Sequence, residues 1–175
     1  MTLVRRAPDE PELFAVLFRR YGRDVHRFVW RRSRNDMLAD DITAVTFEQC
    51  WRSLPGFRPR GATVRPWLFR IAANELASHY RSEGRRDARE RLATVRDEPL
   101  RAPSDDVAVG SDDAALLSAL ARLRERDQIV LSLRFLADLS TEEAAEAMDV
   151  ERGHLAVLQH RALAALRCEL EGSQR

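Results

Sequence analysis

The stretch from Ser140 to Leu170 reads STEEAAEAMDVERGHLAVLQHRALAALRCEL and decides the class of fold. Ser140 and Glu143 have the spacing of a capping box, in which two side chains and two backbone N–H groups bond reciprocally at the start of a helix. A short helix is therefore expected through Met148. Residues 149–153 are expected to form a turn, and a last helix then runs to about Leu170. This order of elements predicts a helix-turn-helix.

The rest of the chain also shows apolar residues at helical spacing, and no segment sustains the alternation of a strand. One helix is expected to begin at Pro11, a second to span about 37–54, and a third to run from near Thr63 to about Ser82. Asn35 or Asp36 is a plausible N-cap for the second helix. Two more helices, marked by leucines between 116 and 136, precede the helix-turn-helix. The sequence thus predicts an all-α protein.

An acidic segment divides these helices into two groups. Residues 92–113 contain Pro, Gly, Ser and Asp without periodicity, which is typical of a flexible linker. We expect one small helical domain at 10–90, a linker at 91–112, and a helix-turn-helix domain at 113–172.

Charge is distributed in blocks, although the formal net charge of the 175 residues is only +1. Residues 1–35 carry nine Arg against four acids, and residues 52–91 carry ten Arg against four acids. Residues 36–51 lie between these basic blocks and carry four acids with no Lys or Arg. Separate blocks allow different surfaces to meet different partners. The absence of Lys is most simply a matter of codon usage.

No catalytic or cofactor-binding arrangement is evident. The chain lacks a Gly-rich phosphate loop, a zinc-protease motif and a nucleophile elbow, so we expect neither an enzyme nor a bound cofactor or metal. Cys50 and Cys168 are expected to be free thiols. Without a signal peptide or a long apolar run, the cytoplasm is the expected compartment.

A basic and aromatic segment spans residues 57–86. Its expected helix has an apolar stripe on one side and a polar, basic face on the other. Aromatic rings stack on unpaired bases, and Arg neutralises phosphates, so the mixture suits opening DNA better than intact duplex. For each of these residues there is an alternative: ordinary core packing for Trp67, and a solvated surface for the polar residues.

The acidic helix at 36–51 has more apolar residues than one narrow stripe needs. Phe47, Trp51 and Leu54 occur beside Leu38, Ile42 and Val45. Some of them could face a protein partner, or the whole set could be buried.

The sequence contains DDIT from Asp40, followed by Phe47 and by WRSLPGF from Trp51. It also contains WLFRIAAN, which ends at Asn74, and the leucine- and alanine-rich segment 133–167. The first segment resembles the region 2 domain of the sigma-70 family of bacterial RNA polymerase subunits, and WLFRIAAN resembles the W-L-x-x-I-A-x-N stretch of that domain. Residues 133–167 resemble region 4 of the same family. Two such domains with only a linker between them is the layout of the extracytoplasmic-function group.

The resemblance implies partners and site residues. The acidic helix would dock on the β′ clamp helices of core polymerase, the second domain would meet the β flap, and an anti-sigma factor is expected by analogy. The implied core-polymerase residues are Asp40, Asp41, Thr43, Phe47 and Trp51. The implied residues for the −10 promoter element are Phe57, Arg70, Asn74, Ser78, Arg81 and Arg85, of which Phe57 and Asn74 would hold a flipped base. The implied residues for the −35 element are Arg134, Arg152, His154, Gln159 and Arg161.

Two positions depart from the family pattern. The family usually has an acidic residue where this chain has Val45. The recognition helix commonly has Lys or Arg, then Ser, then Arg, where this chain has Ala156, Val157 and Leu158. Readout of the −35 element then depends on the neighbouring polar residues and groove shape, or is weak.

Two other classes of function stay open on sequence grounds. A helix-turn-helix repressor or activator with a ligand-sensing first domain explains 114–170 but not the 57–86 face. A helical adaptor that binds only protein would leave every Arg merely solvated.

Overall fold

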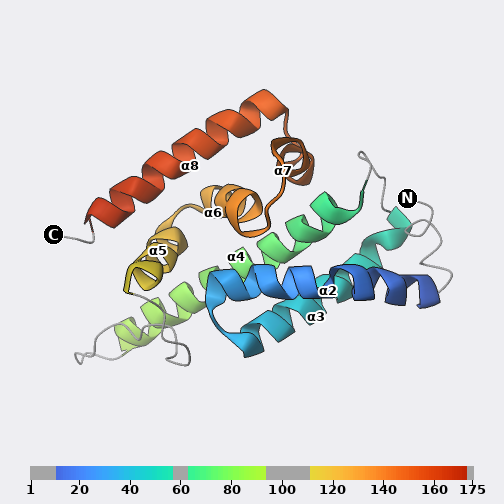
Figure 1. Cartoon of the computed structure of the whole chain (residues 1–175). Helices are drawn as coiled ribbons and strands as arrows, with labels where there is room; N and C mark the ends of the chain where they lie inside the picture. Colours follow the sequence, from blue (N-terminus) through green and yellow to red (C-terminus); the bar gives the residue numbers. More distant parts are fainter. Residues whose placement is uncertain (1–10, 57–62, 94–110, 173–175) are drawn as a thin grey trace.

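The computed structural model describes residues 11–56, 63–93 and 111–172, and within these ranges the chain is helical without a strand (Figure 1). This confirms the predicted all-α class. The elements are α2 (Pro11–Ser33), α3 (Asp36–Ser53), the 3₁₀ turn η1 (Leu54–Gly56), α4 (Arg65–Ala93), α5 (Ser111–Arg122), α6 (Glu125–Leu131), the π-helical turn η2 (Ser132–Leu136), α7 (Thr141–Met148) and α8 (Arg152–Gly172).

Helices α2, α3 and α4 pack together as the N-terminal bundle. Its core is formed by apolar side chains from all three helices: Val25, Phe28, Val29, Ala39, Ile42, Cys50, Leu68, Ala72 and Leu76. Asn35 caps α3, because its side-chain oxygen accepts a hydrogen bond of 3.0 Å from the backbone N–H of Leu38. The predicted cap and the predicted buried stripe of α4 are both confirmed.

Helix α4 continues past its predicted end near Ser82 to Ala93. The apolar stripe, on which the prediction depended, ends at Tyr80. The following residues are mostly Arg, Glu and Ala, which have high helix propensity, and no Pro interrupts them. Local propensity therefore extends the helix where the core no longer requires it.

Helices α5 to α8 form the C-terminal bundle. The Ser140–Glu143 capping box is present at the start of α7, as predicted. Asp149 takes a left-handed conformation with φ of 55°, which ends α7 and turns the chain toward α8. Helix α8 begins at Arg152, inside the predicted turn.

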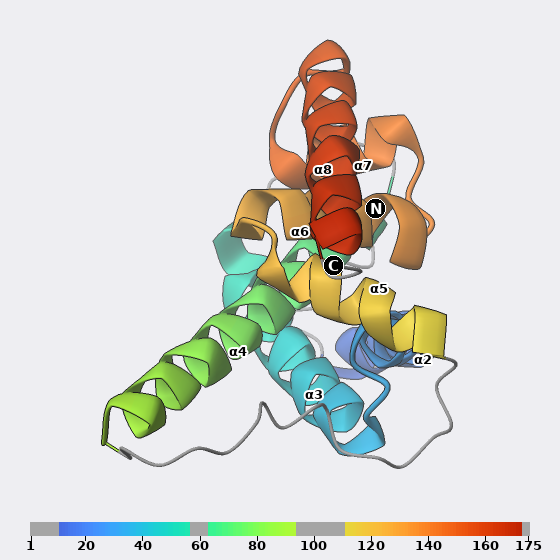
Figure 2. The same ribbon diagram turned by 90° about the vertical axis from the view of Figure 1, so that its left-hand side faces the viewer.

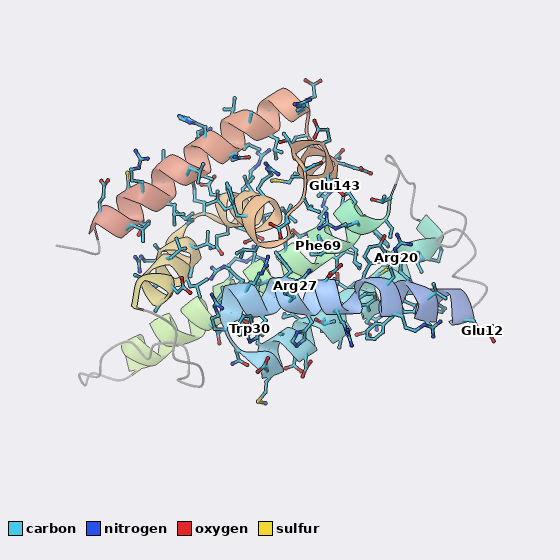
Figure 3. The ribbon with its side chains drawn as sticks, in the orientation of Figure 1. Glu12, Arg20, Arg27, Trp30, Phe69 and Glu143 are labelled. Atoms are coloured by element: carbon cyan, nitrogen blue, oxygen red, sulfur yellow. The ribbon has the colours of Figure 1, made fainter. Side chains whose placement is uncertain are left out.

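The two bundles lie against each other along α4 (Figure 2). Arg65 of α4 donates hydrogen bonds to the carbonyl of Ala137 at 2.6 Å and to the carboxylate of Glu143 at 3.2 Å. Arg31 of α2 donates to the carbonyl of Leu136 at 3.2 Å and to the carboxylate of Asp138 at 3.1 Å. Figure 3 labels Phe69 of α4 and Glu143 of α7 at this junction, and the Arg65 guanidinium lies over the Phe69 ring, 5.1 Å from its centre.

Most of the predicted linker, residues 94–110, lies outside the described residues. Its two predicted ends are helical, because α4 runs to Ala93 and α5 begins at Ser111. None of the described helices is long and apolar enough to cross a membrane. Within the same ranges, no three His, Cys, Asp or Glu side chains gather as a metal site.

Candidate nucleic-acid and polymerase interfaces

The outer face of α4 carries the residues predicted to meet the −10 element. Arg70 and Asn74 are exposed, and Ser78 is half-buried on the same side of the helix. Arg81 is also exposed, but its guanidinium forms an ion pair with Glu125 of α6. Phe57 and the side chain of Arg85 lie outside the described residues. The structure therefore brings Arg70, Asn74 and Ser78 together, and joins Arg81 to the other bundle.

A buried pair fixes α4 against α2 behind this face. The guanidinium of Arg32 lies over the ring of Tyr80, 4.5 Å from its centre, and donates to the carbonyl of Leu117 at 3.2 Å. Burial lowers the pKa of Arg32 and raises the pKa of Tyr80. The Tyr80 hydroxyl donates to the carbonyl of Arg32 at 3.4 Å. These contacts span α2, α4 and α5, and they limit rotation of the α4 face.

The acidic helix α3 divides its predicted docking residues between surface and core. Asp40 and Asp41 are exposed, and Asp40 lies 3.2 Å from the His26 imidazole. Thr43 is only 7% exposed and Phe47 only 3%, so both side chains belong to the core. Trp51 is half-buried and packs on the Phe14 ring, with centres 4.9 Å apart.

The wider apolar set of α3 is mostly turned inward. Ile42 and Phe47 are buried, as is Leu54 of η1, and Leu38 packs against the core. The interpretation in which these residues form a buried set therefore describes most of α3. The exposed surface of the helix carries Asp36, Asp40, Asp41 and Glu48, together with Met37 and Arg52.

The helix-turn-helix presents α8 to solvent on one side. Arg152, His154 and Arg161 are exposed there. Arg134 of η2 and Gln159 of α8 are half-buried and bond to each other, with the Arg134 Nε donating to the Gln159 oxygen at 3.1 Å. The predicted −35 residues thus form two groups, an exposed one on α8 and a bonded pair at its base.

One member of the exposed group, Arg152, forms an ion pair with α7. Arg152 lies 2.8 Å from the carboxylate of Glu142. The pKa of Glu142 is lowered, chiefly by a hydrogen bond from its own backbone N–H and then by the charge of Arg152. This ion pair links the first helix of the motif to the start of the second.

Sequence reasoning missed Arg31 and Arg65, which join the bundles. Both lie within helices that have many other Arg residues, and their acceptors are carbonyls and carboxylates far along the chain. No local pattern marks such a contact. Glu143 was predicted as a cap only, and it also binds Arg65.

Comparison with known families agrees with this division. The sigma-70 region 2 model matches residues 17–86, and the sigma-70 region 4 model matches residues 119–167. The first match covers α3 and most of α4, and the second covers the helix-turn-helix. The chain belongs to the sigma-70 family of RNA polymerase sigma factors.

Individual relatives place it in the extracytoplasmic-function (ECF) group. It is 35% identical to the ECF RNA polymerase sigma factor BldN of Streptomyces coelicolor, over 95% of this chain and 64% of that protein. It is 30% identical to ECF sigma factor SigD of Mycobacterium tuberculosis, over 78% of this chain and 65% of that one. The chain thus spans slightly less than two thirds of these two relatives. It is 34% identical to RNA polymerase sigma factor CarQ of Myxococcus xanthus, over 89% of this chain and 88% of the relative.

A solved structure resembles the whole arrangement. CnrH, in complex with the cytosolic domain of CnrY, is similar with a TM-score of 0.64 and 26% identity. The match covers 98% of this chain and 96% of CnrH. The similarity therefore includes both bundles.

Proposed function

We propose that this protein binds core RNA polymerase, recognises the −10 and −35 elements of a promoter and starts DNA melting, without catalysing a reaction itself. One observation carries the proposal: the region 2 and region 4 matches each contain a helix whose polar face is exposed. In α4 that face includes Arg70 and Asn74, and in α8 it includes Arg152, His154 and Arg161. Such a role belongs in the cytoplasm, where the polymerase acts.

The acidic surface of α3 is the proposed contact with core polymerase, through the β′ clamp helices. Asp40 and Asp41 would make it, because both carboxylates are exposed. Thr43, Phe47 and Trp51 would support the helix from the core side. The C-terminal bundle would meet the β flap.

The face of α4 is the proposed −10 site. Asn74 offers a donor and an acceptor to a base edge, and Arg70 offers a cation to phosphate. Phe57 is proposed to stack on the flipped base, and Ser78, Arg81 and Arg85 to bind the backbone beside it.

The proposed −35 site is the exposed side of α8. Arg152, His154 and Arg161 would contact the duplex directly, and the Arg134–Gln159 pair would fix the helix beneath them. An anti-sigma factor is a further proposed partner, supported by the likeness to CnrH, whose solved structure holds the cytosolic domain of CnrY.

Binding to a forked promoter tests the proposal. The full chain is titrated onto labelled forked DNA with and without purified core polymerase, at several salt concentrations. We expect tight binding only with core, and run-off transcripts from a genomic promoter library. Duplex binding by the chain alone would indicate a repressor or activator, and binding to neither DNA nor core would indicate an adaptor. Either result would overturn the proposal.

A further inference from the structure

We propose that Ala156 and Val157 of α8 recognise thymine methyl groups in the −35 element by apolar contact. The inference rests on the function proposed above and deepens it by naming the chemical group that is recognised. Thymine is the base that displays a methyl group at the edge of the major groove, and small apolar side chains are suited to it.

Three apolar residues, Ala156, Val157 and Leu158, stand where polar residues are expected in α8. They differ in exposure. Leu158 is 6% exposed and packs in the core of the C-terminal bundle. Val157 is 56% exposed, and Ala156 is exposed beside it. Two apolar side chains therefore point outward near the start of the recognition helix, where base contacts are made in this motif. Neither can form a hydrogen bond through its side chain.

The surroundings of these two side chains are basic. Residues 152–168 contain three Arg, two His and no acidic residue, while Glu151 precedes them and Glu142 of α7 pairs with Arg152. Arg152, His154, His160 and Arg161 are all exposed. An apolar centre flanked by Arg and His side chains complements a major groove, whose floor displays methyl groups and whose edges are lined by phosphates. The same flanking side chains would be a poor match for an apolar protein patch, which favours DNA as the occupant.

The shape of the helix also permits close approach. Gly153 lies one turn before Val157 on the same side, and a Cβ atom placed there would have no atom within 4 Å. The opposite side of α8 packs on α5, α6 and α7, so the outer side is open along its length (Figure 1). Nothing on the described chain holds Val157 away from the base edges of a bound duplex.

Deoxyuridine provides a direct test, because it lacks only the methyl group of thymine. A promoter is first chosen by run-off transcription with core polymerase. Each thymine of its −35 element is then replaced singly by deoxyuridine on either strand, and binding of the full chain with core is measured by fluorescence anisotropy. At the thymines that α8 faces, we expect Kd to rise about fourfold per lost methyl group.

At the thymine that Val157 faces, the variant Val157→Ser should bind thymine and deoxyuridine promoters equally. Leu163→Ser is the matched control, because Leu163 is 42% exposed further along the same helix. This variant should keep the difference in affinity between the thymine and deoxyuridine promoters. Equal binding of both promoters by the parent chain would overturn the inference while leaving transcription intact. A Val157→Ser defect of the same size on both promoters would also overturn it, and would point to a protein contact. The absence of any run-off transcript would overturn the proposed function itself.

Discussion

The two cysteines lie in opposite environments, one buried and one exposed. Cys50 lies in the core of the N-terminal bundle, and burial raises the pKa of its thiol to about 12. Cys168 is exposed on α8. Because the thiolate is the nucleophile, we predict that iodoacetamide at pH 8 labels Cys168 and leaves Cys50 unmodified.

Intact-mass measurement before and after denaturation checks this prediction. One label is expected on the native chain and two on the denatured chain, with peptide mapping to locate the first. Rapid native labelling of Cys50 would show that the N-terminal bundle opens easily.

Asn74 is the exposed residue of α4 on which the melting role depends most directly. If its amide holds a flipped base, Asn74→Ala loses about 1 kcal/mol of hydrogen bonding, or about fivefold in open complex. Phe57→Ala should lose about 1–3 kcal/mol of stacking. Permanganate reactivity of the promoter measures both effects.

A template with a pre-melted −10 bubble should partly rescue both variants, because it removes the cost of unpairing. His154→Ala serves as the contrast, since it should weaken the closed complex on either template. Normal melting of duplex promoter by both Phe57→Ala and Asn74→Ala would contradict base capture.

The residue pattern indicated which positions of α4 face outward, but it did not separate the outward from the inward positions of α3. In α4 the apolar and polar positions are separated, so the exposure of Arg70 and Asn74 follows from spacing alone. In α3 apolar residues occur around much of the helix. Only the packed structure shows that Phe47 turns toward Phe14 and Phe18, with ring centres 6.2 Å and 4.8 Å away.

At the scale of elements, the start of α7 is fixed by a capping box, which the sequence predicts well. The Ser140 oxygen accepts from the Glu143 N–H at 3.1 Å, and the Glu143 carboxylate accepts from the Ser140 N–H at 2.9 Å. We predict that Ser140→Ala lowers the free energy of unfolding by about 1 kcal/mol. For a chain of this size the melting temperature should fall by about 2–4 °C, measured by circular dichroism.

Thr141→Ala is the control for this change, because Thr141 lies next to the cap and takes no part in the box. It should have a smaller effect on the melting temperature. Equal losses for the two variants would mean that the capping box contributes little.

Helix α3 presents its charge where a polymerase contact is proposed. Asp41→Arg should weaken binding to core polymerase, because it reverses an exposed charge on that surface. Glu171→Arg makes the same charge change at the exposed end of α8 and should not. A pull-down with purified core measures both, and circular dichroism verifies the fold. Unchanged affinity of Asp41→Arg would exclude this face.

At the scale of the whole molecule, the two bundles of the described structure pack against each other. This arrangement is called the closed form below. The proposed role requires both promoter elements to be reached at once. These lie about 25 base pairs apart, or roughly 85 Å along the duplex. A compact domain of this length has a radius of gyration of about 16 Å, so the closed form is too small to contact both elements. Sequence could predict each bundle from local signals, but not the contacts between them, which join residues far apart in the chain.

The bundles meet through buried apolar side chains and through polar contacts of Arg31, Arg32, Arg34, Arg65 and Arg81, and the polar contacts can be removed by mutation. Arg31 and Arg65 each donate to a carbonyl and a carboxylate of the C-terminal bundle. Such charge-assisted bonds contribute about 1–3 kcal/mol when half-buried. We therefore predict that the double variant Arg31→Ala, Arg65→Ala opens the free chain and increases its radius of gyration in small-angle scattering.

Arg27→Ala is the matched control, because Arg27 pairs with Asp24 inside α2 and is labelled on that helix in Figure 3. It removes the same kind of side chain from the same helix as Arg31 and should leave the radius unchanged. Added salt should expand the parent chain toward the size of the double variant, since the ion pairs at the junction are partly exposed and therefore screened. If the double variant stays as compact as the parent at low and high salt, the apolar contacts along α4 hold the bundles together, and opening must then be driven by core polymerase.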